Sequence, residues 1–156
     1  MTKPHLISPP ISIVLEEFFA GFRPAASDTM RDRISLARVH LERYLEAEGP
    51  NILMPGQRAI LNTEREFDPE GAFVRTMRSD DLYYALYHYL DRVHALVGRE
   101  QRDVQLQMVA ELAAKLWREK LVSPRSVSEC HVLDFDHALR VAREAVAAAE
   151  RRDLRL

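Results

Sequence analysis

The chain has 156 residues, of which 47% are hydrophobic and 29% charged. This is typical of one globular domain and excludes wholesale disorder, a disulfide-rich scaffold and a collagen-like repeat. The 22 basic and 24 acidic residues give a net charge of −2, so no overall field attracts a polyanion. A single cysteine, Cys130, excludes an internal disulfide and favours a reducing cytoplasmic location. We therefore expect one helical domain over residues 1–156, with neither a signal peptide nor a membrane span.

The first two predicted helices lie before residue 50. Ser8 is a candidate cap for a helix over about 11–22, which Gly21 and Pro24 would end. Ser27 is the candidate cap of a second helix, which would run to Gly49 and Pro50. Both segments repeat hydrophobic residues at three- and four-residue spacing, the pattern of an amphipathic helix: Ile11, Val14, Leu15, Phe18 and Phe22 in the first, and Met30, Ile34, Ala37, Leu41 and Leu45 in the second.

Three further helices are predicted in the second half. One begins at Ser79 or Asp80 and ends before Gly98, and the next runs over about 99–122. The latter has two adjoining hydrophobic stripes, so we expect it to be central and Trp117 to belong to the core. The last helix is expected to start near Asp134 or Asp136, either of which could cap it.

A connection of about thirty residues, 49–78, separates the second and third predicted helices. Loops of that length are uncommon in compact domains, and this one holds too many hydrophobic residues for a free linker, so much of it should pack against the core. Asp68, Pro69, Glu70 and Gly71 predict a tight turn. We consider a short β-hairpin over residues 60–74 for this stretch.

The densest group of possible metal ligands is Glu129, Cys130 and His131 with Asp134, Asp136 and His137. Its spacing matches no familiar zinc finger. Because Asp134 and Asp136 serve equally well as helix caps, we favour a structural role over a metal site made from Cys130, His131, Asp134 and His137.

Four of the five tyrosines lie in seven residues of the third predicted helix. Tyr89 belongs to its hydrophobic stripe, whereas the other three spread around the helix and could anchor a partner. Tyr84, His88 and Asp91 share one face, where a carboxylate can orient an imidazole. A polar surface is the favoured interpretation, because a helix surface alone supplies neither a nucleophile nor a pocket.

Two stretches resemble DNA-binding modules. A short helix that includes Leu15 to Phe19 is followed by the Ser27 cap and a longer helix. Ser79 to Leu82 then begin a helix that leads to a long one ending in Leu116 to Val122. This order of helices resembles the core-binding, SAM-like domain of tyrosine recombinases. The catalytic domain of that family has no counterpart in this sequence. Residues 122–128 also resemble the turn and recognition-helix start of a LuxR-type helix-turn-helix, with 110–116 as its first helix. These resemblances imply DNA binding without strand cleavage.

The sequence therefore predicts an all-α fold, a compact bundle or orthogonal array of about five main helices with a long, partly structured connection. No phosphate-binding loop, nucleophile elbow or HExxH motif is present, so we expect no catalytic residues, no cofactor and no metal. The leading functional hypothesis is a non-enzymatic protein that binds a protein partner or itself, through Tyr83, Tyr84, Tyr87 and His88. The alternative is a small DNA-binding accessory or regulatory protein, with Arg31, Arg38, Arg118 and Arg125 as phosphate contacts.

Overall fold

The computed structural model describes residues 8–25, 27–93, 95–96, 98–123 and 129–155. These residues contain no β-strand, which confirms the all-α prediction. They form seven α-helices and one short 3-10 helix, with the following bounds: α1 Ile11–Gly21, α2 Asp28–Glu48, η1 Gly49–Ile52, α3 Pro55–Phe67, α4 Ala72–Thr76, α5 Ser79–Val93, α6 Arg99–Arg118 and α7 Glu129–Leu154.

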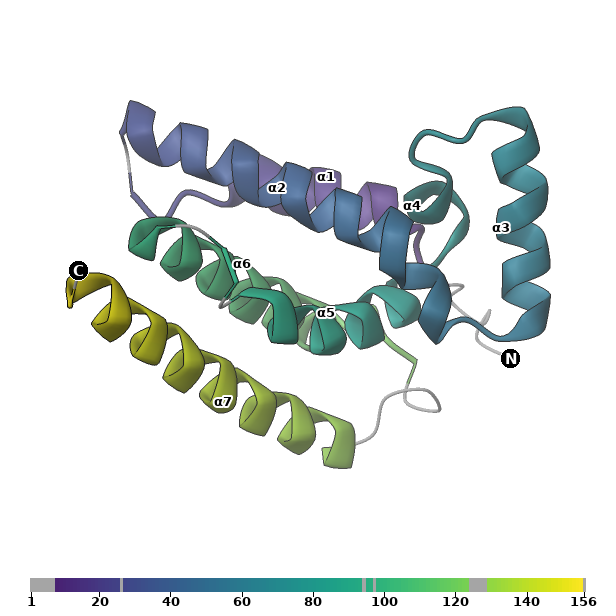
Figure 1. Ribbon diagram of the computed structural model, residues 1–156. Helices are drawn as coiled ribbons and strands as arrows, with labels where there is room; N and C mark the ends of the chain where they lie inside the picture. Colours follow the sequence, from purple (N-terminus) through teal and green to yellow (C-terminus); the bar gives the residue numbers. More distant parts are fainter. Residues whose placement is uncertain (1–7, 26, 94, 97, 124–128, 156) are drawn as a thin grey trace.

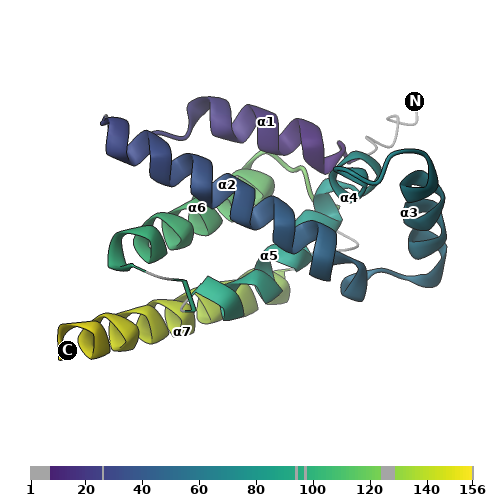
Figure 2. The ribbon, with the colours of Figure 1, turned by 45° about the horizontal axis from the view of Figure 1, so that its top comes forward.

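The helices are stacked around one hydrophobic core. α1 and α2 lie on one side of α5 and α6, and α7 lies on the other (Figures 1 and 2). α5 and α6 pack against each other, and each also contacts α2 and α7. α3 stands at one end of the bundle, where its main neighbour is α4 (Figure 1). The expectation of a central α6 is confirmed, because Met108, Leu112 and Leu116 are completely buried.

The first two helices have different starts. Ser27 caps α2 as predicted, because its hydroxyl accepts a hydrogen bond of 3.0 Å from the backbone N–H of Met30. Ser8 does not cap α1. That helix follows Pro10 without a side-chain cap, and the Ser8 hydroxyl lies 3.4 Å from Asp80 on α5. The start of α1 is held instead by its backbone, since the N–H of Ile11 donates to the carbonyl of Met77 at 3.0 Å.

The ends of the later helices differ from the prediction. α5 ends at Val93 and α6 at Arg118. α7 begins at Glu129, so Asp134 and Asp136 lie inside it and their predicted capping role is wrong. The helix extends backwards because residues before Asp134 also pack: Val132 lies half-buried against the core, and the His131 ring contacts the Tyr84 ring. Trp117 is 40% exposed, so its predicted place in the core is also wrong.

The long connection is helical, and the hairpin considered over 60–74 is wrong. Pro55 occupies the first turn of α3, where its missing N–H costs no hydrogen bond. The predicted turn is present before α4, with Gly71 at a φ of 68°, a backbone conformation that favours glycine. Leu61 and Phe73 pack into the core as helical side chains. The segment is therefore held to the core by side chains buried at helical spacing, not by the alternating side chains of a β-strand.

Candidate functional site

A continuous groove runs along one face of α5. It consists of three adjoining hollows of about 920, 490 and 380 Å³. The first two share Asn51, Ile52 and His88, and the last two share Tyr44 and Glu48. We call this surface the α5 groove. One wall is α5, and the other is formed in turn by α3, η1 and the carboxyl-terminal half of α2.

The α5 wall carries the polar face that the sequence indicates. Tyr84 and His88 line the widest part of the groove, and His88 and Asp91 line the middle. Tyr84 is half-buried and packs edge-on against the His131 ring of α7, 5.7 Å between centroids. No hydrogen bond joins His88 to Asp91 among the described contacts, so the structure does not assemble an imidazole with an orienting carboxylate here.

The α3 wall is tied to α5 by Gln57. Its side-chain oxygen accepts from the backbone N–H of Met54 at 3.0 Å, which closes the first turn of α3. Its side-chain nitrogen donates to Asp81 on α5 at 2.9 Å. The second carboxylate oxygen of Asp81 accepts from the N–H of Arg78 at 3.0 Å. Gln57 thus provides a hydrogen-bond acceptor for a backbone N–H at the start of α3 and also links α3 to α5 across the groove.

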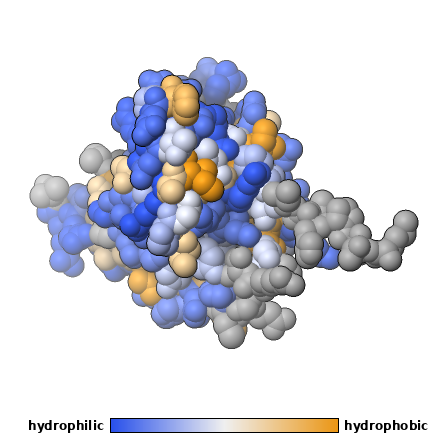
Figure 3. Space-filling model, turned by 90° about the vertical axis from the view of Figure 1, so that its right-hand side faces the viewer, coloured by the Kyte–Doolittle hydropathy of each residue, from blue (hydrophilic) through white to orange (hydrophobic). Residues whose placement is uncertain are grey.

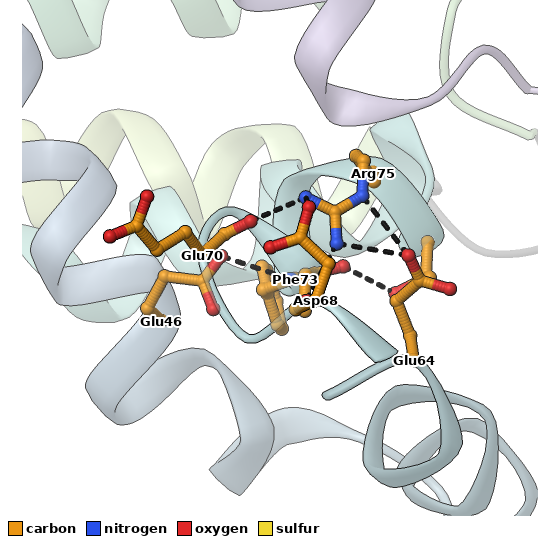
Figure 4. Close-up of polar contacts among 8 residues, drawn as sticks. Glu46, Glu64, Asp68, Glu70, Phe73 and Arg75 are labelled. Atoms are coloured by element: carbon orange, nitrogen blue, oxygen red, sulfur yellow. Dashed lines mark hydrogen bonds and ion pairs between the residues drawn. The ribbon is translucent and has the colours of Figure 1, made fainter. Parts of the chain in front are cut away.

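The far end of α3 is held by Arg75, on the short helix α4 (Figure 4). Its guanidinium donates two hydrogen bonds to Glu64 on α3, at 3.1 and 2.9 Å, and one to the carbonyl of Asp68 at 2.8 Å. Glu46 on α2 accepts from the backbone N–H of Phe73 at 2.9 Å. These contacts join α2, α3 and α4 by several charge-assisted bonds, so α3 is a fixed wall rather than a loose arm.

Large hydrophobic side chains line the rim of the α3 wall and remain open to solvent. Met54 is 69% exposed and Ile60 58% exposed, and both line the widest hollow. Phe67, 82% exposed, lies seven residues after Ile60 and therefore on the same side of the helix. Figure 3 shows the face of the molecule at this end, where hydrophobic groups interrupt a mainly hydrophilic surface. Exposed groups of this kind, gathered beside a groove, mark contact surfaces.

The middle of the groove is polar. Arg92 of α5 reaches across to Glu48 of α2, with 2.7 Å between nitrogen and oxygen. Beside this pair, burial raises the pKa of the Tyr44 phenol above 10, and the negative charge of Glu48 raises it further. Tyr44 therefore stays protonated at neutral pH and offers a neutral hydroxyl to a ligand. It is not poised as a nucleophile or a base.

The structure separates the residues predicted to bind a partner. Tyr84 and His88 line the α5 groove. Tyr83 does not belong to an open surface: it is 4% exposed and packs against Phe135 of α7 at 5.0 Å between centroids. Burial raises the Tyr83 pKa to about 12. Tyr87 is 38% exposed and lies beside the His88 ring, on the α7 side. Sequence could not distinguish these tyrosines because it does not show where α7 docks.

The arginines considered for DNA binding do not form one cluster in the described contacts. Arg31 and Arg38 lie on α2, and Arg118 lies at the end of α6. Arg38 pairs with Glu42 at 2.9 Å and lies over the Phe19 ring, while Arg31 is 3.9 Å from Asp28. Arg125 and most of the residues 122–128 that resemble a recognition-helix start lie outside the described part of the chain.

The possible metal ligands also lie apart or outside the described residues. Among the described side chains, no group of three or more His, Cys, Asp or Glu residues is arranged to hold a metal ion. His131, Asp134, Asp136 and His137 lie on α7, with His131 packed against Tyr84. The side chains of Glu129 and Cys130 lie outside the described set.

Much of the groove comes from residues that sequence reasoning did not assign to a site. Glu48, Arg92 and Asn51 carry no motif. The sequence predicts that much of the connection packs against the core, without saying which of its hydrophobic residues do so. Leu53, Leu61, Ala72, Phe73 and Met77 are buried, whereas Met54 and Ile60 are exposed.

Comparisons with known proteins supply no precedent for this site. No family model, curated protein or solved structure matches the chain. Within the described residues, the helices are too short or too polar to cross a lipid bilayer.

Proposed function

We propose that this protein acts by non-covalent binding of another protein chain in the α5 groove. The observation that carries the proposal is the exposed hydrophobic rim of α3, with Met54, Ile60 and Phe67 each more than half exposed, beside a groove that the Gln57 and Arg75 contacts hold open. Binding a partner would bury this rim, and each large side chain removed from water contributes about 1.5–3 kcal/mol.

The polar groups of the groove support binding rather than catalysis. The Tyr44 phenol stays protonated, and Glu48 and Arg92 are joined to each other. No described contact links His88 to a base, an acid or a nucleophile. A site of this kind can select a partner by shape, hydrophobic contact and charge.

A site-specific crosslinking experiment tests the proposal. A photo-crosslinking amino acid is placed at Ile60 or, as the matched control, at Leu36 on α2; the two side chains are 58% and 59% exposed. We expect a discrete protein adduct from position 60 only. The adduct partner is then purified, and its affinity should fall roughly tenfold or more with Ile60→Asp and stay unchanged with Leu36→Asp.

Adducts of equal yield and identity from both positions would contradict a specific surface on α3. So would the absence of any adduct together with a strictly monomeric protein in light scattering. Titration with duplex DNA at low and moderate salt examines the alternative function, because contacts to phosphates give an affinity that falls steeply with salt. Salt-sensitive DNA binding lost on replacing Arg31, Arg38, Arg118 and Arg125 would favour that alternative.

A further inference from the structure

The carboxylates of the α5 groove lack cationic partners. Asp80 accepts from the backbone N–H of Ser123 at 2.6 Å, and Asp81 accepts from Gln57. These donors are neutral, so they satisfy hydrogen bonds without cancelling charge. Asp91 is exposed and belongs to no ion pair of the described residues. Arg78, which also lines the widest hollow, is the single guanidinium set against these three acids in this part of the groove.

Arg58, exposed on α3, donates to the carbonyl of Pro50 beside the groove at 3.1 Å, and the other charges along the groove are paired or lie outside its acidic part. Arg92 and Glu48 neutralise each other, and Arg43 lies at the α2 end, in the smallest hollow. On the carboxyl-terminal part of α3, Glu66 is exposed and takes part in no ion pair of the described residues. The charged residues that line the wide and middle parts of the groove are four carboxylates and two arginines, so this lining is acidic, although the whole chain carries only −2.

The hydrophobic rim lies beside this acidic surface with helical spacing. Ile60 and Phe67 are two turns apart on α3, about 10 Å along its axis. Tyr84 and Asp91 are also two turns apart on α5. The described residues offer no β-strand edge to which an extended peptide could add. α3 stands crosswise to α5 (Figure 1), so the two rows run in different directions and meet at the widest hollow, which Ile60 and Tyr84 both line. An amphipathic helix laid across this hollow is the recognition mode that fits a hydrophobic row beside an acidic one.

We propose that the occupant of the α5 groove is a basic amphipathic helix of a partner protein. Its apolar side chains contact Met54, Ile60 and Phe67, and its lysine or arginine side chains face Asp91 and Asp81. This inference rests on the proposed function and names the partner's chemistry. The contact surface is short, so the complex belongs to the weak, transient class of interfaces.

The test uses two designed peptides of about 15 residues, long enough to form an amphipathic helix on binding. Both carry the same leucine stripe, and their polar face is lysine in one and glutamate in the other. Binding to the whole protein is measured by fluorescence anisotropy at about 50 and about 300 mM salt. We expect the lysine peptide to bind roughly tenfold or more tightly than the glutamate peptide at low salt, with the preference shrinking at high salt.

Variants locate the bound peptide. Ile60→Ser should weaken binding of the lysine peptide roughly tenfold, and Leu36→Ser should leave it unchanged. Asp91→Asn should weaken binding a few-fold and reduce its salt dependence, whereas Asp32→Asn, an exposed acid on α2, should do neither. All four positions are exposed, and far-ultraviolet circular dichroism checks that each variant folds.

Three results would overturn the inference: equal affinity for both peptides, binding insensitive to Ile60→Ser, or equal effects of Asp91→Asn and Asp32→Asn. A concentration-dependent dimer abolished by Ile60→Ser would make a second copy the occupant and also overturn it. If the peptides fail while the partner crosslinked at position 60 still depends on Ile60, the partner's chemistry is wrong and the proposed function stands. If the crosslink is absent as well, both this inference and the proposed function are overturned.

Discussion

At the scale of single residues, a buried polar network joins three helices. The hydroxyl of Tyr89, which is completely buried on α5, accepts a hydrogen bond from Gln105 of α6 and lies 2.7 Å from Nδ1 of His40 on α2. Burial lowers the pKa of His40 below 6.5, and the nearby charge of Arg43 lowers it further. The imidazole is therefore neutral at pH 7, and its Nδ1 forms a hydrogen bond with the Tyr89 hydroxyl.

Removing this hydroxyl should destabilise the protein. Tyr89→Phe removes the partner of the buried side-chain nitrogen of Gln105 and of the half-buried Nδ1 of His40, and we expect the free energy of unfolding to fall by about 1–3 kcal/mol. Tyr87→Phe is the matched control, because Tyr87 is 38% exposed, and its cost should stay within about 0.5 kcal/mol. Urea unfolding measures both. Equal, small effects would show that the network contributes little to stability.

The carboxyl group of Asp103 on α6 makes the free energy of unfolding depend on pH. Its pKa is raised above 3.8 first by desolvation and then by the like charge and hydrogen bond of Glu150 on α7; Arg99 and Arg102 oppose this in part. A carboxyl group that holds its proton more tightly in the folded state favours folding at low pH. That contribution is lost as the pH rises from 3.8 through the raised value.

Replacing this carboxyl with a neutral amide should therefore stabilise the protein at neutral pH. We expect Asp103→Asn to unfold at higher urea than the wild type at about pH 7, and the difference to disappear at about pH 2.5, where the carboxyl is protonated in both states. Asp32→Asn provides the control on α2, away from Glu150. An Asp103→Asn variant that is no more stable at pH 7 would contradict this account.

At the scale of elements, α2 and α4 meet at a glycine. A Cβ atom placed on Gly49 would lie 2.6 Å from the Phe73 ring, closer than carbon atoms can approach. Phe73 is completely buried, so its ring has little room to move. The close approach lets α2 end against α4 and sets where η1 and α3 begin.

Gly49→Ala should therefore destabilise the protein by about 1–3 kcal/mol, because overpacking displaces a buried ring. Gly21→Ala is the matched control: a Cβ atom placed there would meet no other atom within 4 Å, and alanine costs less chain entropy in a helix, so a gain of up to about 1 kcal/mol is expected. Thermal unfolding distinguishes the signs. A neutral or stabilising Gly49→Ala would mean that Phe73 can shift without penalty.

At the scale of the whole molecule, α7 completes the core by covering the tyrosines of α5. Phe135 packs against Tyr83 at 5.0 Å and Tyr87 at 6.2 Å between ring centroids. Further along α7, Arg102, 3% exposed, reaches from α6 to Asp153 at 2.6 Å. α7 is thus anchored towards both of its ends. The tyrosine face that sequence indicates as a partner surface is partly used within the chain.

Phe135→Ala should cost about 3–5 kcal/mol, the usual penalty for emptying a buried aromatic site. Phe67→Ala, at a position 82% exposed, should change stability by less than about 0.5 kcal/mol. Chemical denaturation of the two variants gives the comparison, and hydrogen exchange shows whether α7 opens before the rest. Equal stabilities would mean that α7 docks without contributing to the core.

Local sequence patterns predict the helical class, the caps and stripes of α2, the start of α5 and the central place of α6. These follow from local rules, since a Ser27 cap or a stripe at three- and four-residue spacing acts within one segment. Which polar and hydrophobic residues face each other depends on contacts between distant segments. The helices of 49–78 depend on Leu61 and Phe73 finding a core, and the early start of α7 depends on Val132 packing against the core and His131 packing against Tyr84. The α5 groove depends on Gln57 reaching α5, a contact between residues 24 positions apart that no local pattern specifies.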